Sequence, residues 1–270
     1  MKMDFTIDWL EFTFLYPVNE ENTTTVFDEF LDAFPEFEDL LDEMVLLERG
    51  RNGYTQVYAF TDEFTISYNP DEERLGVHVT FPAHGLYRIM KIFGLDDISE
   101  YADAAALLLI LKSRHCRISR IDLAYDDYDK TFTPHDFMRW KMNERISTQC
   151  KCCGFMMSEA TKGGTFYLGK RGKGRFLRIY DKEYESKGAI NSIRYEFELR
   201  QEWATLIQDK ILADVEFSVA DLIEGMFTIT NEYELTDNDS TNATRKNRAG
   251  VDEKWQLFLD SIRTIRKMQV

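Results

Sequence analysis

The fold of this 270-residue chain is best predicted from two segments, TFYLGKRGKGRFLRIYDKEYE (165–185) and IRYEFELR (193–200). Apolar and aromatic residues alternate in them with charged ones, and glycines interrupt the first. Because residues two apart in a strand lie on the same face, each alternating run predicts a strand with one apolar and one charged face. Gly172 and Gly174 predict a basic hairpin between two of these strands.

The segment RISRIDLAY (117–125) alternates in the same way and predicts another such strand. The charged faces of these strands are expected to carry Arg120, Asp122, Asp126, Arg178, Tyr180, Lys182, Arg194, Glu196, Glu198 and Arg200. If the strands share one sheet, carboxylates, arginines and one tyrosine converge on an open surface. A solvated face crossed by ion pairs would show the same periodicity, so the alternation alone leaves both interpretations open.

The chemistry of these side chains favours a reactive site. Clustered carboxylates repel one another unless a cation joins them, and Mg²⁺ or Mn²⁺ is held by a few carboxylates with water and phosphate oxygens. A tyrosine nucleophile beside such a metal, with arginine and lysine to hold phosphate, suits phosphodiester transesterification. We therefore expect chemistry of this type on the charged face.

The other segments predict an α+β fold. Asp4–Tyr16 predicts a strand, Thr23–Leu47 predicts a helical stretch that Pro35 interrupts, and three β-like segments follow between residues 54 and 81. Helices and strands alternate later in the chain, which closes with an amphipathic helix and shows no internal repeat. The predicted architecture is an antiparallel sheet with a charged active-site face, flanked by helices.

Charge is distributed unevenly along the chain. The formal net charge of −15 argues against indiscriminate binding to nucleic acid or to anionic membranes. Residues 1–50 hold fourteen acidic residues against two basic ones, a net charge of −12. Residues 162–182 hold seven basic residues against one acidic one, a net charge of +6. One central segment therefore attracts polyanions, whereas the first segment repels them.

Composition excludes several classes of protein. The chain is 44% hydrophobic and 30% charged, so a packed core is expected, and its low Gly (14) and Pro (5) content excludes fibrous and low-complexity classes. The longest apolar run, Ala104–Leu111, is too short to span a bilayer, and Met1–Trp9 lacks the pattern of a signal peptide. Four cysteines make no disulfide framework in a chain of this size. We therefore expect a cytoplasmic protein.

The paired segments RIYDKEYE (178–185) and RYEFELR (194–200) resemble the replication initiation factor family. That family contains the rolling-circle replication initiators of staphylococcal-type plasmids and the related relaxases of conjugative elements. Three further segments, IDWLEFTF (7–14), GVHVTF (76–81) and RISRIDLAYDD (117–127), fall in the expected order. The resemblance therefore covers essentially the whole chain.

The resemblance implies a metal-dependent enzyme that nicks and religates DNA at a specific site. In the family, the tyrosine of an R-I-Y-x-K motif attacks a phosphodiester, which leaves a 5′-phosphotyrosyl link and a free 3′-OH. That position here is Tyr180, and Arg178 and Lys182 are expected to hold the scissile phosphate. The carboxylates that strand parity selects for Mg²⁺ or Mn²⁺ are Asp122, Glu196, Glu198 and, behind them, Asp126.

Expected partners follow from the same resemblance. The basic residues expected to contact DNA are Lys170, Arg171, Lys173, Arg175, Arg120, Arg194 and Arg200. The DNA would be the origin, single-stranded or cruciform at the nick site, and a host helicase with other replication proteins would act beside it in a bacterial cytoplasm. A homodimer is compatible with the family, and no membrane contact is expected.

The predicted domain organisation is one large region followed by a short tail. Residues 1–231 are expected to form the catalytic and DNA-binding region, and a division into two similar sub-sheets, 1–112 and 113–231, stays open. Residues 232–250 are polar and rich in turn-forming residues, which predicts a linker. Residues 251–270 are expected to form the C-terminal helix.

Alternatives to this assignment stay open. Tyr184 has the same strand parity as Tyr180 and is a rival nucleophile. A non-catalytic, sequence-specific DNA-binding regulator of a mobile element fits the net charge of −15. A metal-dependent nuclease that uses water would leave no adduct between protein and DNA.

Cysteine offers a second candidate metal site. Cys150, Cys152 and Cys153 contain a C-x-x-C motif, and Cys116 lies upstream. This group leaves a zinc site open, although no second spaced pair follows, and buried thiols are the alternative. The four histidines are isolated from one another in sequence, so a metal at the charged face must rest on carboxylates.

Overall fold

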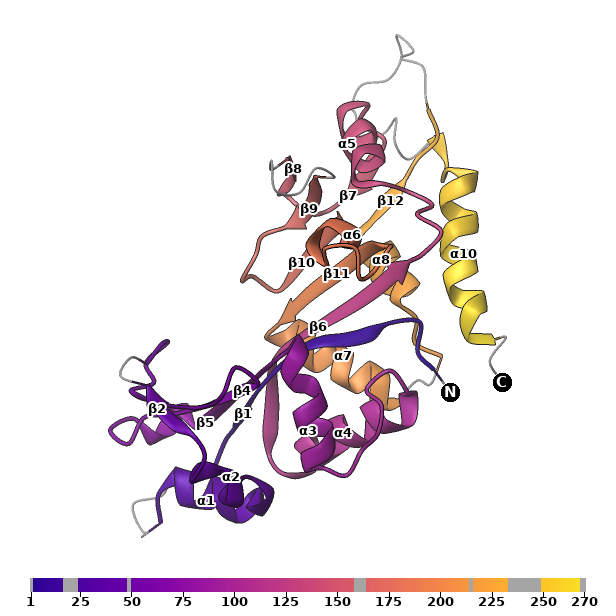
Figure 1. Ribbon diagram of the computed structural model, residues 1–270. Coiled ribbons are helices and arrows are strands. Elements are labelled where there is room, and N and C mark those ends of the chain that lie inside the picture. Colours follow the sequence, from indigo (N-terminus) through magenta and orange to yellow (C-terminus); the bar gives the residue numbers. More distant parts are fainter. Residues whose placement is uncertain are drawn as a thin grey trace. The chain divides into compact units, whose positions relative to one another are not determined.

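The computed structural model describes residues 2–16, 24–47, 50–157, 164–213, 216–232 and 249–267 (Figure 1). The strands are β1 (Thr6–Phe14), β2 (Val45–Leu47), β3 (Gln56–Phe60), β4 (Phe64–Tyr68), β5 (Val77–Pro82), β6 (Cys116–Asp127), β7 (Ile146–Thr148), β8 (Cys153–Met156), β9 (Thr165–Gly169), β10 (Arg175–Asp181), β11 (Ile193–Arg200) and β12 (Phe227–Ile229). The α-helices are α1 (Val26–Ala33), α2 (Glu38–Leu41), α3 (Leu86–Ile92), α4 (Tyr101–Ser113), α5 (Pro134–Met142), α6 (Lys182–Glu185), α7 (Glu202–Ala213), α8 (Val219–Met226) and α10 (Glu253–Lys267). The 3-10 helices are η1 (Pro35–Phe37), η2 (Glu73–Leu75) and η3 (Ala83–Gly85).

Most of the strands form one ten-stranded sheet, in the order β2-β3-β4-β5-β1-β6-β11-β10-β9-β8. Neighbours such as β1 and β5, β3 and β4, and β9 and β10 run antiparallel. β7 and β12 pair separately as a two-stranded sheet. The predicted architecture, an antiparallel sheet flanked by helices, is confirmed.

The chain divides into two compact units, and each is described by itself. Unit 1 comprises Met1–Phe5, Ala124–Glu198 and Glu216–Val270. Unit 2 comprises Thr6–Leu123 and Leu199–Val215. The chain passes from unit 2 to unit 1 inside β6, between Leu123 and Ala124. It returns to unit 2 near the end of β11, between Glu198 and Leu199.

An aromatic core joins β1, β5 and α1 in unit 2. The rings of Phe12 and Phe81, on neighbouring strands, lie 6.5 Å apart, and Phe34, just after α1, lies 6.0 Å from Phe12. Thr25 starts α1 with a capping box, in which its hydroxyl accepts the Asp28 N–H at 3.1 Å. Each fully buried phenylalanine contributes about 1.5–3 kcal/mol, so this cluster holds α1 against the sheet.

The predicted helical stretch 23–47 is only partly helical. α1, η1 and α2 follow one another around Pro35, as the proline predicts, but Val45–Leu47 form strand β2 at the edge of the sheet. Three consecutive aliphatic residues fit a strand as well as a helix, and pairing with β3 decides between them, with Leu46 opposite Tyr58. The helical prediction for these three residues is wrong.

Helix α7 completes unit 2 by packing on α4. The side-chain amide of Gln208 donates to the Leu108 carbonyl at 3.1 Å. The Tyr101 hydroxyl donates to the Ile211 carbonyl at 2.6 Å. A helix that follows β11 in sequence is thus built into the same unit as α4, which precedes β6.

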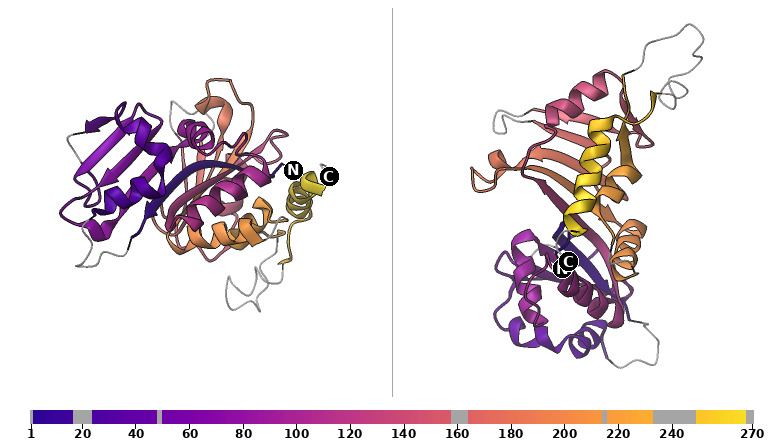
Figure 2. Two further views of the ribbon diagram at one scale, coloured as in Figure 1. Left: turned by 90° about the horizontal axis from the view of Figure 1, so that it is seen from below. Right: turned by 90° about the vertical axis from the view of Figure 1, so that its right-hand side faces the viewer.

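In unit 1, α5 and α10 pack on the apolar face of the strands (Figure 2). The ring of Phe137 on α5 lies 6.0 Å from Tyr195 on β11 and 6.0 Å from Trp255 on α10. Phe258 on α10 lies 5.6 Å from Tyr195. Because Tyr195 faces these helices, its neighbours Arg194 and Glu196 face the other side of the sheet.

The predicted linker lies largely outside the described residues, which omit 233–248. The residues that flank the linker lie side by side, because Thr230 and Val251 form an isolated antiparallel bridge. Across the described part of the chain, the helices are too short or too polar to cross a membrane.

Candidate active site

Tyr180, near the end of β10, is hydrogen-bonded to Glu196 on β11. Its Oη donates to Glu196 Oε2 at 2.8 Å. Both side chains are nearly enclosed, with 7% of Tyr180 and 5% of Glu196 exposed. The parity prediction holds here, because Ile179 and Phe197, the next residues along each strand, lie in the apolar core.

Arg178 completes a group of three on the same face. Its guanidinium forms an ion pair with Oε1 of Glu196, the oxygen that Tyr180 does not use. It also lies 5.3 Å from the centre of the Tyr180 ring. A phenol, a carboxylate and a guanidinium are therefore in mutual contact, as the two alternating strands predict.

Burial is the largest cause that raises the pKa of Tyr180, and the negative charge of Glu196 and the hydrogen bond to it raise it further. Burial is the largest single influence on the pKa of Arg178 and lowers it, but the charge of Glu196, the hydrogen bond to it and the nearby Tyr180 and Glu185 together outweigh burial and raise that pKa. At neutral pH the phenol is thus protonated and the guanidinium charged. A proton acceptor is needed before this oxygen can act as a nucleophile, and Glu196 lies in hydrogen-bonding contact with it.

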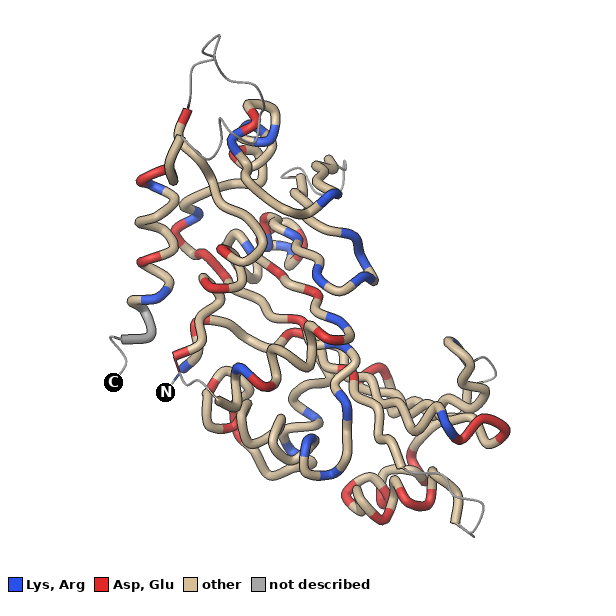
Figure 3. The backbone as a smooth tube through the Cα atoms, turned by 180° about the vertical axis from the view of Figure 1, so that it is seen from behind, with Lys and Arg blue, Asp and Glu red and all other residues tan. Residues whose placement is uncertain are grey.

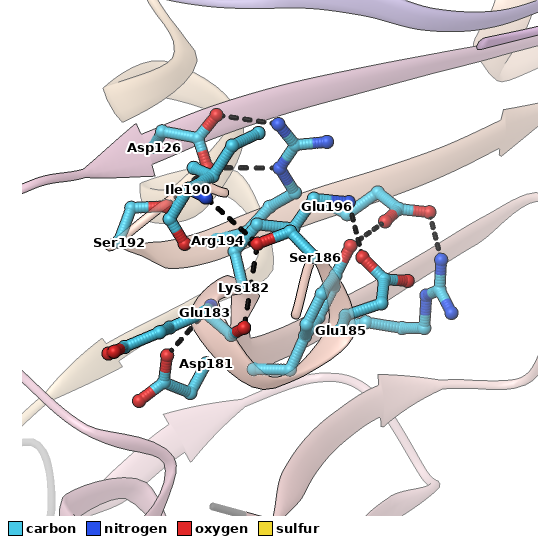
Figure 4. A network of polar contacts seen from close by, with 12 residues as sticks. Asp126, Asp181, Lys182, Glu183, Glu185, Ser186, Ile190, Ser192, Arg194 and Glu196 are labelled. Atoms are coloured by element: carbon cyan, nitrogen blue, oxygen red, sulfur yellow. Dashed lines mark hydrogen bonds and ion pairs between the residues drawn. The ribbon is translucent and has the colours of Figure 1, made fainter. Parts of the chain in front are cut away.

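Lys182 approaches the same tyrosine from a helix. We expected it on the strand face, but β10 ends at Asp181, whose side chain accepts the Glu183 N–H at 3.0 Å and so starts α6. The Nζ of Lys182 still lies 5.8 Å from the Tyr180 ring centre, and it forms an ion pair with Glu185 (Figure 4). The strand assignment of Lys182 is wrong, while its position beside Tyr180 holds.

Asp126 and Arg194 form a second ion pair on this side of unit 1 (Figure 4). Arg194 Nη2 lies 2.6 Å from Asp126 Oδ2, and Arg194 Nε lies 3.0 Å from Oδ1. The Ser192 hydroxyl donates to Oδ1 at 2.8 Å. Asp126 was predicted as a metal ligand and Arg194 as a DNA contact, and here the two bind each other.

The charged face is less open than predicted. Beyond Tyr180 and Glu196, only 5% of Glu198 and 7% of Arg194 is exposed. The reason is local, because long arginine side chains lie across the carboxylates and the tyrosine ring next to them. Ion pairs of this kind are the feature that strand alternation alone could not distinguish from a reactive site.

The basic hairpin between β9 and β10 is held at its tip by Glu198. The Gly172 N–H donates to Glu198 Oε1 at 2.9 Å, and Arg171 Nε lies 3.7 Å from Oε2. Lys170 and Lys173 are exposed beside them. Figure 3 shows Lys and Arg gathered along this loop, whereas Asp and Glu mark the segment of α1 and α2.

In unit 2, Arg120 and Asp122 form a buried ion pair, with Arg120 Nε 2.7 Å from Asp122 Oδ1. Arg120 also lies 4.3 Å from the ring centre of Trp9 and 3.5 Å from Glu11. Arg200 lies 3.4 Å from the same Glu11 carboxylate. Both arginines predicted to contact DNA are thus paired with carboxylates. Sequence reasoning missed Trp9 and Glu11, although their alternation in IDWLEFTF places them on one face.

The predicted metal ligands do not gather into a cation site in this arrangement. Among the described residues, no group of three or more His, Cys, Asp or Glu side chains is placed to hold a metal ion. Arginines contact Asp122, Asp126, Glu196 and Glu198. Since the donors present do not fit such a site as they stand, no chemical step below passes through a metal.

The rival residues occupy different surroundings. Tyr184 lies in α6 and is 45% exposed, because the helix removes it from the strand parity it was assigned. Cys152 is exposed, Cys150 and Cys153 are half-buried, and Cys116, in unit 2, is buried. The predicted burial of thiols in the strand from Cys153 to Met157 holds only in part, because Cys153 is half-buried and the neighbouring Cys152 is exposed.

Comparison with known proteins gives the family and supports the fold. The family model described as replication initiation factor matches residues 116–270, more than half of the chain. The chain is also similar to the solved structure of a rolling circle replication initiator protein from Geobacillus stearothermophilus. The TM-score is 0.73 at 20% sequence identity, over 96% of this chain and 96% of that one. At that identity the similarity shows the fold alone. No curated protein matches the chain.

Proposed function

This chain belongs to the replication initiation factor family, and we propose that it is a rolling-circle replication initiator that nicks and religates origin DNA through Tyr180. The observation that carries the proposal is the hydrogen bond from Tyr180 Oη to Glu196 Oε2. It joins a nucleophile to a proton acceptor on one sheet face, as a nucleophile and base require. The similar solved structure is that of a rolling circle replication initiator protein, which agrees with this assignment.

The proposed reaction exchanges one ester bond for another. Tyr180 Oη attacks the scissile phosphorus and its proton passes to Glu196. A bond from the phenol oxygen to phosphorus forms, the bond from phosphorus to the 3′ oxygen breaks, and that oxygen takes up a proton from water to leave as a 3′-OH. The 5′-phosphotyrosyl link keeps the energy of the broken ester, so the reverse reaction closes the strand without a further cofactor.

Two cations are proposed to hold the phosphate. Arg178 lies over the Tyr180 ring and Lys182 lies near it, so both are within reach of a group attacked by the phenol oxygen. Each is paired with a carboxylate in the free protein, Arg178 with Glu196 and Lys182 with Glu185. Binding of phosphate therefore has to exchange these ion pairs for contacts with DNA.

The hairpin is proposed as the main DNA contact outside the reacting centre. Lys170, Arg171 and Lys173 are exposed on one loop, in a chain whose net charge is −15. A local cluster of this kind directs a polyanion to one place while the remaining acidic surface disfavours other sites. Arg120, Arg175, Arg194 and Arg200 stay secondary candidates, because each already contacts a carboxylate or a carbonyl.

A requirement for Mg²⁺ or Mn²⁺ is part of the proposal, and the candidate ligands Asp122, Asp126, Glu196 and Glu198 would have to leave their arginine partners before they could hold the ion. Origin DNA is the proposed substrate. A host helicase, other replication proteins and a second copy of this chain are the proposed partners. None of the bond changes above depends on where a metal is bound.

A non-catalytic DNA-binding regulator is the second candidate. The burial of Tyr180, of which 7% is exposed, favours it, since a nucleophile must reach the phosphate. Under this alternative, Tyr180, Glu196 and Arg178 would be a structural polar network, and DNA binding would persist without cleavage.

The deciding experiment uses supercoiled DNA of the element that encodes the protein. It is incubated with protein and Mg²⁺ or Mn²⁺, stopped with SDS, and examined for nicked circles and for a strand linked to protein. The adduct is expected with the wild type and with Tyr184→Phe, and it is expected to vanish with Tyr180→Phe while DNA binding survives. Binding without nick or adduct in both metals would assign the regulator. An adduct that only Tyr184→Phe removes would move the nucleophile to α6.

A further inference from the structure

The contact between Glu198 and the basic hairpin joins a buried group to an exposed one. Glu198 is 5% exposed on β11, whereas the side chain of Arg171 is 69% exposed on the loop. The Gly172 N–H completes the contact at 2.9 Å from Glu198 Oε1. The carboxylate therefore lies enclosed in the sheet, while most of the Arg171 side chain that it contacts lies in solvent.

The stem of the hairpin is anchored without Glu198. The Gly169 N–H donates to the Cys152 carbonyl at 2.8 Å, on the side of β8. At the start of β10, Arg175 Nη1 donates to the carbonyl of Gly225 in α8 at 2.8 Å. Within the tip, the Lys173 N–H donates to the Lys170 carbonyl at 3.1 Å, so loss of the Glu198 contact would free Gly172 and Arg171 and leave the turn and the strands in place.

The groups that Glu198 engages form an anion-binding pair. A backbone N–H at a residue with φ of 75°, next to a guanidinium, is the kind of donor set that binds phosphate as readily as carboxylate. The space around Gly172 is open, because a Cβ built there would meet no atom within 4 Å. The loop therefore leaves room for a phosphate beside Gly172, next to the exposed Arg171 guanidinium.

We propose that Glu198 is a latch that holds the hairpin tip in the free protein, and that a backbone phosphate of DNA displaces its carboxylate from Gly172 and Arg171. The identity of the displacing anion rests on the proposed function, whereas the latch itself is a property of the free protein. Glu198 is on this view a positioning residue for the hairpin. The role differs from that of a metal ligand, which Glu198 was expected to be.

Hydrogen exchange of the free protein in EDTA tests the latch without DNA and without metal. With Glu198→Ala, the Gly172 amide should exchange about five- to tenfold faster, because its hydrogen bond is lost. Glu198→Gln should restore most of the protection, because its amide oxygen can still accept the Gly172 N–H. Glu202→Ala, an exposed acidic residue at the start of α7, is the matched control and should leave exchange at the tip unchanged. Equal exchange in wild type and Glu198→Ala would overturn the latch.

Binding of a short mixed-sequence single-stranded oligonucleotide, also in EDTA, tests displacement. Glu198→Ala should bind at least about threefold more tightly than wild type, because the competing carboxylate is gone. Arg171→Ala, at an exposed position that should not disturb folding, should abolish this gain when combined with Glu198→Ala. Equal or weaker binding by Glu198→Ala would overturn displacement. If the wild type and all variants fail to bind both this oligonucleotide and origin DNA, the proposed function fails, and the exchange experiment still decides whether the latch exists.

Discussion

The phenol oxygen of Tyr180 and the carboxylate of Glu196 are 2.8 Å apart on neighbouring strands, with the tyrosine as donor. The second oxygen of the same carboxylate is bound by Arg178. Glu196 therefore has one oxygen toward the proton and one toward a cation. This division keeps a negative charge beside a phenol whose pKa burial and Glu196 both raise.

The first prediction concerns Glu196→Gln, which keeps the shape of the side chain and removes its ability to accept the proton. Single-turnover formation of the protein–DNA adduct should slow by about 10²- to 10⁴-fold, the usual contribution of a general base. Origin binding should change little. If raising the Mg²⁺ or Mn²⁺ concentration restores the rate, Glu196 acts on a metal and the assignment as proton acceptor is wrong.

The second prediction concerns the charge of the hairpin. Replacing Lys170, Arg171 and Lys173 by alanine should weaken binding to origin duplex and lower the slope of log affinity against log salt by about 3, at about 0.9 per phosphate contact. Affinity is measured over a range of NaCl concentrations. Replacing Arg51, Arg74 and Lys91 in unit 2 removes the same charge elsewhere and is the control. Equal slopes for the two triple variants would remove the hairpin from the DNA path.

The third prediction concerns metal removal. EDTA should abolish adduct formation and leave binding of origin DNA in place, and Mg²⁺ or Mn²⁺ should restore the adduct. Asp122→Asn, Asp126→Asn and Glu198→Gln are compared by the metal concentration that gives half-maximal adduct, which should rise for a true ligand. Full cleavage in EDTA would show that the arginine-paired carboxylates need no metal.

The fourth prediction concerns alkaline unfolding. The pKa of Tyr180 is raised in the folded state, whereas an unfolded tyrosine titrates near 10. The stability from this residue is thus complete below about pH 10 and is lost as the pH rises toward the folded pKa. Over that range the free energy of unfolding should fall by about 1.4 kcal/mol per pH unit for this residue.

Urea unfolding of wild type and Tyr180→Phe between about pH 9.5 and 11.5 measures this difference. The slope of stability against pH should be shallower in the variant by that amount. Tyr125 and Tyr195, whose pKa values burial also raises, keep a slope in both proteins. Parallel curves for the two proteins would show that Tyr180 titrates normally when folded.

The fifth prediction concerns the cysteines. Burial raises the pKa of Cys116 to about 12, and its side chain is enclosed, whereas Cys152 is exposed. Iodoacetamide at pH 8 should label Cys152 first and Cys116 only after unfolding, as followed by peptide mass spectrometry. Labelling of Cys152 that begins only after EDTA is added would instead indicate zinc bound near Cys150–Cys153.

The sequence predicted the face of each catalytic candidate, because strand parity is a local property. Tyr180, Arg178 and Glu196 share a face for this reason, and the pairing of β10 with β11 brings them into contact. The position of Lys182 could not be predicted in the same way, since Asp181 ends the strand by capping α6. A side chain that hydrogen-bonds to the backbone two residues later competes with strand pairing. Alternation of residue types does not show whether the strand continues or a helix starts at such a residue.

The partner of each charge was also beyond the sequence. Arg120 bonds to Asp122 two residues along its own strand, whereas Arg178 bonds to Glu196 across a strand boundary. Both carboxylates look alike in the alternating pattern. Only strand order and register decide which cation reaches which carboxylate, and these come from long-range packing. Because the sequence does not give the strand order, it also could not predict that Glu11 on β1 contacts Arg120 and Arg200.

The path of the chain between the two units has a consequence for how the protein is made on the ribosome. Unit 2 needs Leu199–Val215 in addition to Thr6–Leu123, and unit 1 needs its final helix α10 as well as the first five residues. Neither unit corresponds to a continuous piece of the gene. Early strands must wait for later segments during synthesis, and a cut anywhere between Leu123 and Leu199 would leave both units incomplete.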